Sequence, residues 1–182
     1  MLKNRTRAIL VGIFILAAYG VLVSGATNSK VVVMVADVVS GLAVIGIATL
    51  MFPFFKVFNK KISLTYLLLK VLEGSLMVIG GTLFLFDSLQ FMRGWIYDNV
   101  HIYTFIVGGF IFYYLLYKTK IIPKFISVWG AIAISALTLT TLLRLIGLHN
   151  PALDMLLILI VTNEVFLAVW LIVKGFKLPK NS

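Results

Sequence analysis

The sequence predicts an all-α membrane protein, a bundle of six transmembrane helices with both termini in the cytoplasm. The chain has 182 residues, of which 62% are hydrophobic and only 12% are charged, and its mean hydropathy is +1.11. Such values are far more apolar than those of an ordinary soluble domain. Apolar runs of roughly 18–25 residues also recur, each long enough to cross a hydrocarbon core of about 30 Å. We therefore expect a single membrane domain over residues 1–182.

Six such runs follow one another along the chain. The predicted spans are residues 8–24, 31–54, 62–86, 100–117, 125–146 and 152–173.

The first three spans are separated by polar or basic connections. The first follows a basic front and ends at the polar turn 25–30 without a clear signal cleavage site, so we interpret it as a membrane span. Pro53 lies at the end of the second span, where the missing backbone donor of a proline matters least. The third span follows the basic link 55–61 and contains Lys70 and Glu73.

The last three spans have recognisable boundaries as well. The longest connection, 87–99, carries large apolar side chains and is a predicted amphipathic cap on the membrane surface. Pro123 suits the first turn of the fifth span. Asn150 and Pro151 are the predicted cap and first residue of the sixth.

The distribution of lysine and arginine predicts the orientation. The N-terminus, the second and fourth connections and the C-terminal tail hold three basic residues each. The first, third and fifth connections hold only Lys30 and Arg93 between them. Because cytoplasmic loops carry the excess of positive charge, both termini are expected in the cytoplasm.

Two glutamates are expected near the bilayer midplane, with Lys70 one turn nearer the cytoplasm. At 1.5 Å per residue, Glu73 lies about 17 Å into the third span and Glu164 about 18 Å into the sixth. Lys70 is three residues before Glu73, so the two share a helix face and can pair. A charge at this depth costs roughly 2.5–3.5 kcal/mol on the insertion scale. This face should therefore point into the bundle or into a wet cavity.

Together with other polar residues, these groups form a predicted site for a small molecule or ion. The predicted set is Asp37, Lys70, Glu73, His101, Asn163 and Glu164. One ion pair cannot satisfy so many polar groups, so water or a ligand has to supply the rest. We expect a pocket that opens outward, with the two glutamates at its floor. A buried ion pair that only fixes helix register remains the alternative.

The remaining features restrict the chemistry. Arg144 and Asp154 lie at matching heights beside the last turn and are a predicted structural ion pair. The chain has no cysteine and only two histidines, too few for the usual zinc ligand sets, so we predict no metal, cofactor or catalytic residue. The lysines are spread between apolar runs, which argues against nucleic acid as a partner. The expected partners are the lipid bilayer and a small-molecule or lipid ligand, and the oligomeric state stays open.

Four stretches of the chain resemble a known family. They are VADVVSGLAV around Asp37, KVLEG at 70–74, IIPKFISVWG at 121–130 and NEVFLAVWLIVKGF at 163–176. Over 31–176 the chain is thereby similar to the bacterial six-span family catalogued as domain of unknown function 4386. The resemblance implies a six-span bundle in the bacterial cytoplasmic membrane and a role for Asp37, Glu73 and Glu164, but no known activity.

Three functions are compatible with these observations. We favour a binding protein or transporter, because spans one to three and four to six have opposite orientations and each triplet ends in a helix with a midplane glutamate, as in an inverted repeat. The second is a non-catalytic immunity or partner protein with a structural ion pair. The third is an intramembrane enzyme acting on lipid, with a glutamate as general base and His101 nearby. It ranks last because no nucleophile or metal set accompanies these groups.

Overall fold

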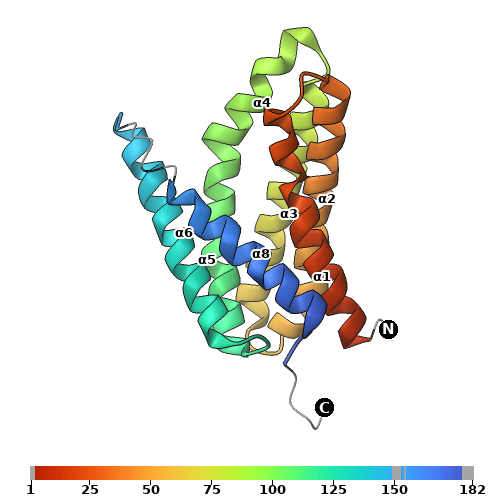
Figure 1. The fold of residues 1–182 in the computed structure, drawn as a ribbon, viewed down its shortest axis with the longest axis vertical. Coiled ribbons are helices and arrows are strands. Elements are labelled where there is room, and N and C mark those ends of the chain that lie inside the picture. Colours follow the sequence, from red (N-terminus) through yellow and green to blue (C-terminus); the bar gives the residue numbers. More distant parts are fainter. Residues whose placement is uncertain (1–2, 149–152, 154, 178–182) are drawn as a thin grey trace.

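In the computed structural model the chain forms a bundle of helices packed side by side (Figure 1). The structure describes residues 3–148, 153 and 155–177, and within them every regular element is helical. Five helices in this part of the chain are long and apolar enough to cross a membrane, and a shorter apolar helix accompanies them. The predicted all-α membrane bundle is confirmed.

The elements follow in simple order. They are α1 (Asn4–Ala18), the 3₁₀ segment η1 (Tyr19–Gly25), α2 (Lys30–Phe55), α3 (Lys60–Leu83), the 3₁₀ turn η2 (Asp87–Leu89), α4 (Gln90–Ile96), the π-helical segment η3 (Tyr97–His101), α5 (Ile102–Thr119), α6 (Lys124–Leu145) and α8 (Leu157–Val173).

Most predicted spans differ from these helices by only a few residues at each end. The first is the exception, because α1 ends at Ala18 and the chain continues as the tighter η1. Two glycines in η1, Gly20 and Gly25, disfavour a regular α-helix there. The sixth span cannot be compared at its start, since residues 149–152 and 154 lie outside the described part.

The predicted surface cap at 87–99 consists of short helical pieces. The segments η2, α4 and η3 run directly into α5 without an intervening loop. Phe91 and Trp95 are exposed whereas Ile96 is buried, as an amphipathic segment at a membrane surface requires. This arrangement places one face of α4 against the bundle.

Local sequence explains several helix ends. The side chain of Ser29 accepts a hydrogen bond from the backbone N–H of Val32 at the start of α2. Asn59 does the same for Ile62 at the start of α3. These are N-caps, which satisfy backbone donors that the helix itself leaves unpaired. Lys120 ends α5 with a left-handed backbone conformation, φ 56°.

The helices form a closed ring of neighbours. Helix α1 packs against α2, α2 against α3, α3 against α5, α5 against α6 and α6 against α8, and α8 returns to α1. Figure 1 shows α8 crossing the bundle obliquely between α6 and α1. Arg5 secures the closure, because its guanidinium donates hydrogen bonds of 2.7 and 3.0 Å to the carbonyls of Ile172 and Val173 at the end of α8.

The start of α1, the end of α8 and the α2–α3 and α5–α6 connections lie at the same end of the bundle (Figure 1). These segments carry most of the chain's basic residues. We call this end the basic end. Its composition agrees with the charge pattern from which the cytoplasmic orientation was predicted.

Candidate functional site

A cavity of about 70 Å³ lies within the ring of helices. Its polar lining comes from Tyr66, Lys70 and Glu73 of α3 and Glu164 of α8. Apolar side chains of α1, α2, α5 and α8 complete the wall: Ile15, Ala18, Val44, Ile47, Phe105, Phe112 and Leu167. The cavity therefore gathers three of the six residues that the sequence assigned to a common site.

Lys70 and Glu73 form the ion pair expected from their spacing. The Lys70 Nζ lies 2.7 Å from Glu73 Oε2, and the two side chains are only 10% and 1% exposed. The ammonium also lies 4.9 Å from the centre of the Phe105 ring, a cation–π contact. Gly108 of α5 leaves room for the lysine, because a Cβ there would lie 3.0 Å from Lys70 Cε.

Glu164 has a partner outside the cavity lining. Its Oε2 accepts a hydrogen bond of 2.8 Å from the hydroxyl of Tyr19, which η1 places at this level. Tyr113 lies within electrostatic range of the same carboxylate. Protein surrounds Glu164 on all sides. Its side chain is nevertheless partly accessible, because it lines the cavity.

The charged groups of the cavity interact with one another. Lys70, Glu73 and Glu164 line the same cavity, and of the two glutamates Glu73 is the one at hydrogen-bond distance from the Lys70 ammonium. Tyr66 is within range of both carboxylates, and its ring stacks on Phe112 with centroids 5.6 Å apart. Two carboxylates and one ammonium thus line one small cavity, a donor set suited to a small cation with its water.

Asp37 does not line this cavity, which corrects the expectation that it belongs to the same site. Its carboxylate is fully buried and accepts two hydrogen bonds from Arg93 of α4, at 2.7 and 2.9 Å. The arginine also lies over the ring of Tyr97, 4.7 Å from its centre. Gly81 permits this approach, since a Cβ there would lie 2.5 Å from Asp37 Cβ. Asp37 therefore ties α2 to α4.

His101 and Asn163 also lie outside the cavity lining. The His101 ring packs against Tyr97 and Phe105, with centroids 4.7 and 6.4 Å away, and its Nε2 is buried without a hydrogen-bond partner. Asn163 turns toward α6, where its side-chain amide donates a 3.0 Å hydrogen bond to the carbonyl of Ile126. Asn163 therefore joins α8 to α6 through its NH2 group.

A family model described as Domain of unknown function (DUF4386) matches residues 84–175. The chain belongs to this family. No curated protein and no solved structure matches the chain. This DUF4386 protein is an integral membrane protein of unknown activity. The matched region includes Glu164 but not the Lys70–Glu73 pair, so the cavity lies between the matched region and the part of the chain before it.

Two further groups of this DUF4386 protein belong to the site although the sequence analysis did not select them. The Tyr19 hydroxyl donates a hydrogen bond to Glu164, and Tyr66 lines the cavity beside Lys70 and Glu73. The sequence could have indicated these two residues, because a tyrosine buried in an apolar span needs a hydrogen-bond partner for its hydroxyl. The predicted pair of Arg144 with Asp154 is not tested, since Asp154 lies outside the described residues.

Proposed function

We propose that this protein binds a small positively charged ligand, an inorganic cation or a small protonated amine, in the cavity lined by Lys70, Glu73 and Glu164. The observation that carries the proposal is the presence of two carboxylates and one ammonium in the lining of a cavity of about 70 Å³. Binding of this kind is also the first step of transport. We place the protein in a bacterial cytoplasmic membrane, with the basic end inside.

Charge balance supports a cationic ligand. When both glutamates are ionised, Lys70 compensates one of them and one negative charge remains. An uncompensated charge inside a membrane bundle costs several kcal/mol. Tyr19 stabilises Glu164 by a hydrogen bond but adds no positive charge. A bound cation beside Glu164 removes this cost, whereas an anion increases it.

The size of the cavity sets a limit on the ligand. A water molecule needs about 10–15 Å³ of such space, so about 70 Å³ holds a few waters or a small ion that keeps part of its hydration shell. Pockets for drug-sized ligands measure roughly 300–1,000 Å³. The proposed ligand is therefore no larger than a few heavy atoms.

Thermal unfolding of the purified protein in detergent tests this proposal. The midpoint is measured in lithium, sodium, potassium and methylammonium chlorides at constant ionic strength, with N-methylglucamine as the bulky replacement cation. A ligand present at 100 times its dissociation constant stabilises by about 2.7 kcal/mol, which corresponds to a rise of about 5–10 °C for a protein of this size. We expect such a rise with at least one small cation.

Two variants make the result specific. Glu164→Gln keeps the shape of the side chain and leaves Lys70 paired with Glu73, so the cation-dependent rise should disappear. Asp87→Asn removes an exposed carboxylate that pairs with Lys30, and the rise should persist. If no cation shifts the parent, or if Glu164→Gln responds as the parent does, the binding proposal fails and a purely structural ion pair becomes the better account.

A further inference from the structure

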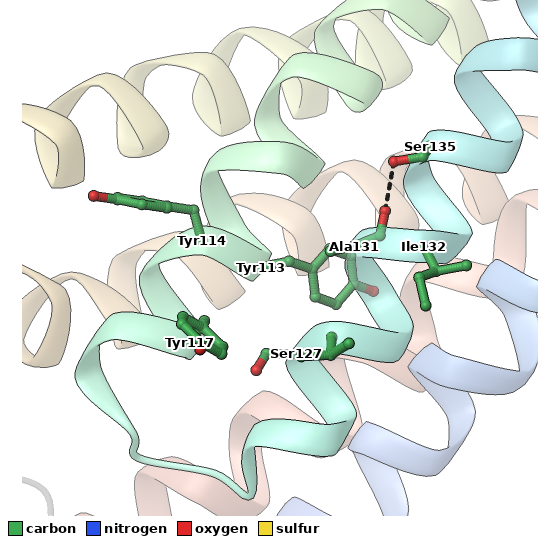
Figure 2. Close-up of a pocket in the computed structure, with 8 residues that line it drawn as sticks. Tyr113, Tyr114, Tyr117, Ser127, Ala131, Ile132 and Ser135 are labelled. Atoms are coloured by element: carbon green, nitrogen blue, oxygen red, sulfur yellow. Dashed lines mark hydrogen bonds between the residues drawn. The ribbon is translucent and has the colours of Figure 1, made fainter.

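A second concave feature lies on the outer face of the bundle, between α5 and α6. This groove has a volume of about 450 Å³, and Figure 2 shows Tyr113 extending from α5 toward α6 within it. Its walls are Tyr113, Tyr114, Tyr117, Ser127, Val128, Ala131, Ile132 and Ser135. Because Tyr114, Val128 and Ile132 are exposed on membrane-spanning helices, the groove faces the lipid.

The α6 wall of the groove is apolar in character in spite of its serines. The hydroxyls of Ser127 and Ser135 donate to backbone carbonyls of their own helix, at 2.8 Å each, and the bond from Ser135 to Ala131 is drawn in Figure 2. Helices α5 and α6 pack against each other at Gly130, where a Cβ would lie 1.9 Å from the Tyr113 ring. The groove therefore presents a surface suited to a hydrocarbon chain and not to a polar solute.

Three lysines lie in and beside the α5–α6 connection, at the basic end of the two helices. Lys118, Lys120 and Lys124 are all exposed. Two of them contact tyrosines that line the groove: Lys118 Nζ lies 5.6 Å from the centre of the Tyr114 ring, and Lys124 Nζ lies 5.5 Å from that of Tyr117. These cation–π contacts hold the ammonium groups beside the groove.

The protein does not supply the counter-charge for these lysines from the same helices. The chain has six acidic residues, and none of them lies between Asn99 and Leu153, the stretch that contains α5 and α6. Asp37, Glu73 and Asp87 are already paired with Arg93, Lys70 and Lys30. The negative charge that complements these three lysines therefore comes from outside the two helices.

We propose that the α5–α6 groove binds an anionic phospholipid, with an acyl chain along the groove and the headgroup phosphate at Lys118, Lys120 and Lys124. A membrane provides both parts of this ligand in one molecule and in the correct order of depth. Each lysine near a membrane surface strengthens the attraction to anionic lipid about fivefold. The site is separate from the central cavity and does not depend on its ligand.

Native mass spectrometry of the detergent-solubilised protein tests the headgroup part. Phosphatidylglycerol and phosphatidylcholine with identical acyl chains are compared by the dissociation constant of the first bound lipid. We expect phosphatidylglycerol to bind at least about 25-fold more tightly. The double change Lys118→Gln and Lys124→Gln should weaken it about 25-fold, fivefold per lysine, and leave phosphatidylcholine unchanged.

A matched control uses two exposed lysines of the same end that do not border the groove. Lys56→Gln with Lys60→Gln removes equal charge from the α2–α3 connection and should leave the first lipid affinity within about twofold. Equal losses in both double variants would show that the basic end attracts lipid diffusely, and the proposal would be overturned. Equal binding of the two lipids in the parent would overturn it as well.

The acyl-chain part has its own variant. Ala131→Phe fills the groove and keeps the lysines, so phosphatidylglycerol should bind about as weakly as it does to the double lysine variant. Leu139→Phe adds the same ring at an exposed position of α6 that does not line the groove, and binding should be retained. If inorganic phosphate at equal concentration competes with phosphatidylglycerol, or if Ala131→Phe binds this lipid as the parent does, the site binds an anion without a lipid groove. Either result would overturn the proposal.

Discussion

At the scale of single residues, three acidic side chains within the helices find partners by different routes. Lys70 and Glu73 pair within one helix, Asp37 pairs with Arg93 from another helix, and Glu164 accepts from a tyrosine hydroxyl. Hydrocarbon supplies no hydrogen bonds, so such groups persist in a membrane bundle only when protein or trapped water satisfies them. Glu164 is the one of these three acids that faces the cavity without a cation at hydrogen-bond distance in the described structure.

The first prediction concerns Glu73. Glu73→Gln leaves the Lys70 ammonium buried without its partner, and breaking comparable buried pairs costs about 3–5 kcal/mol. We expect a clearly lower midpoint of thermal unfolding in detergent. Asp87→Asn, which breaks a pair whose carboxylate is 91% exposed, serves as the control and should unfold at the parent temperature.

A double change sharpens the interpretation of this experiment. Replacing both partners, Lys70→Met with Glu73→Leu, removes the buried charges together, and such replacements are often neutral or stabilising. The double variant should therefore recover most of the stability lost in Glu73→Gln. A midpoint for Glu73→Gln equal to that of the parent would mean that Lys70 finds another partner, contrary to the pairing described above.

At the scale of elements, glycines determine how closely neighbouring helices approach. Gly41 of α2 and Gly74 of α3 face each other, and a Cβ on either would lie 2.5 or 2.4 Å from the backbone carbonyl oxygen of the other. Gly12 of α1 similarly allows α8 to approach, with a Cβ there only 2.7 Å from the carbonyl oxygen of Ala168. Small residues serve membrane bundles in this way because helix association in lipid depends on close van der Waals packing.

The second prediction follows from the α2–α3 contact. Gly41→Ala pushes the two backbones apart, because a backbone carbonyl cannot move aside as a flexible side chain does, and overpacking of this kind costs about 1–3 kcal/mol. Thermal unfolding should show the loss. Gly94→Ala in α4 is the matched control, since nothing lies within 4 Å of a Cβ there, and alanine should be neutral or slightly stabilising in this helix. Equal destabilisation by both changes would show that the contact is less tight than described.

At the scale of the whole molecule, the basic segments occupy one end of the bundle. Folding therefore brings together charges that are far apart in the sequence, at the N-terminus, in two connections and near the C-terminus. This asymmetry orients a membrane protein during insertion, because the basic segments remain in the cytoplasm. The same end provides the proposed lipid headgroup site.

The third prediction concerns this orientation. The natural chain has no cysteine, so single cysteines report on it directly. Asn28→Cys lies between η1 and α2, and Val57→Cys, at a position 85% exposed, lies in the α2–α3 connection. A membrane-impermeant maleimide applied to intact cells should label Asn28→Cys only, and permeabilised cells should show labelling of both. The opposite pattern in intact cells would reverse the topology.

The sequence by itself determined the membrane class, most helix boundaries and the Lys70–Glu73 pair. Each of these depends on local information: the length of an apolar run, the charges at its ends, or a spacing of three residues along one helix. The depths of Glu73 and Glu164 also follow from counting residues, and both side chains line the same cavity.

Only the tertiary structure decided which side chains face one another across the bundle. Asp37 pairs with Arg93 at a separation of 56 residues, and Glu164 binds Tyr19 at a separation of 145. In a soluble protein an apolar stripe indicates which face of a helix is buried. In a membrane the lipid-facing side is as apolar as the core, so the sequence pattern does not determine how each helix is rotated about its axis. It therefore does not determine which neighbours Asp37, His101 and Asn163 face. Packing of the six helices supplies that rotation.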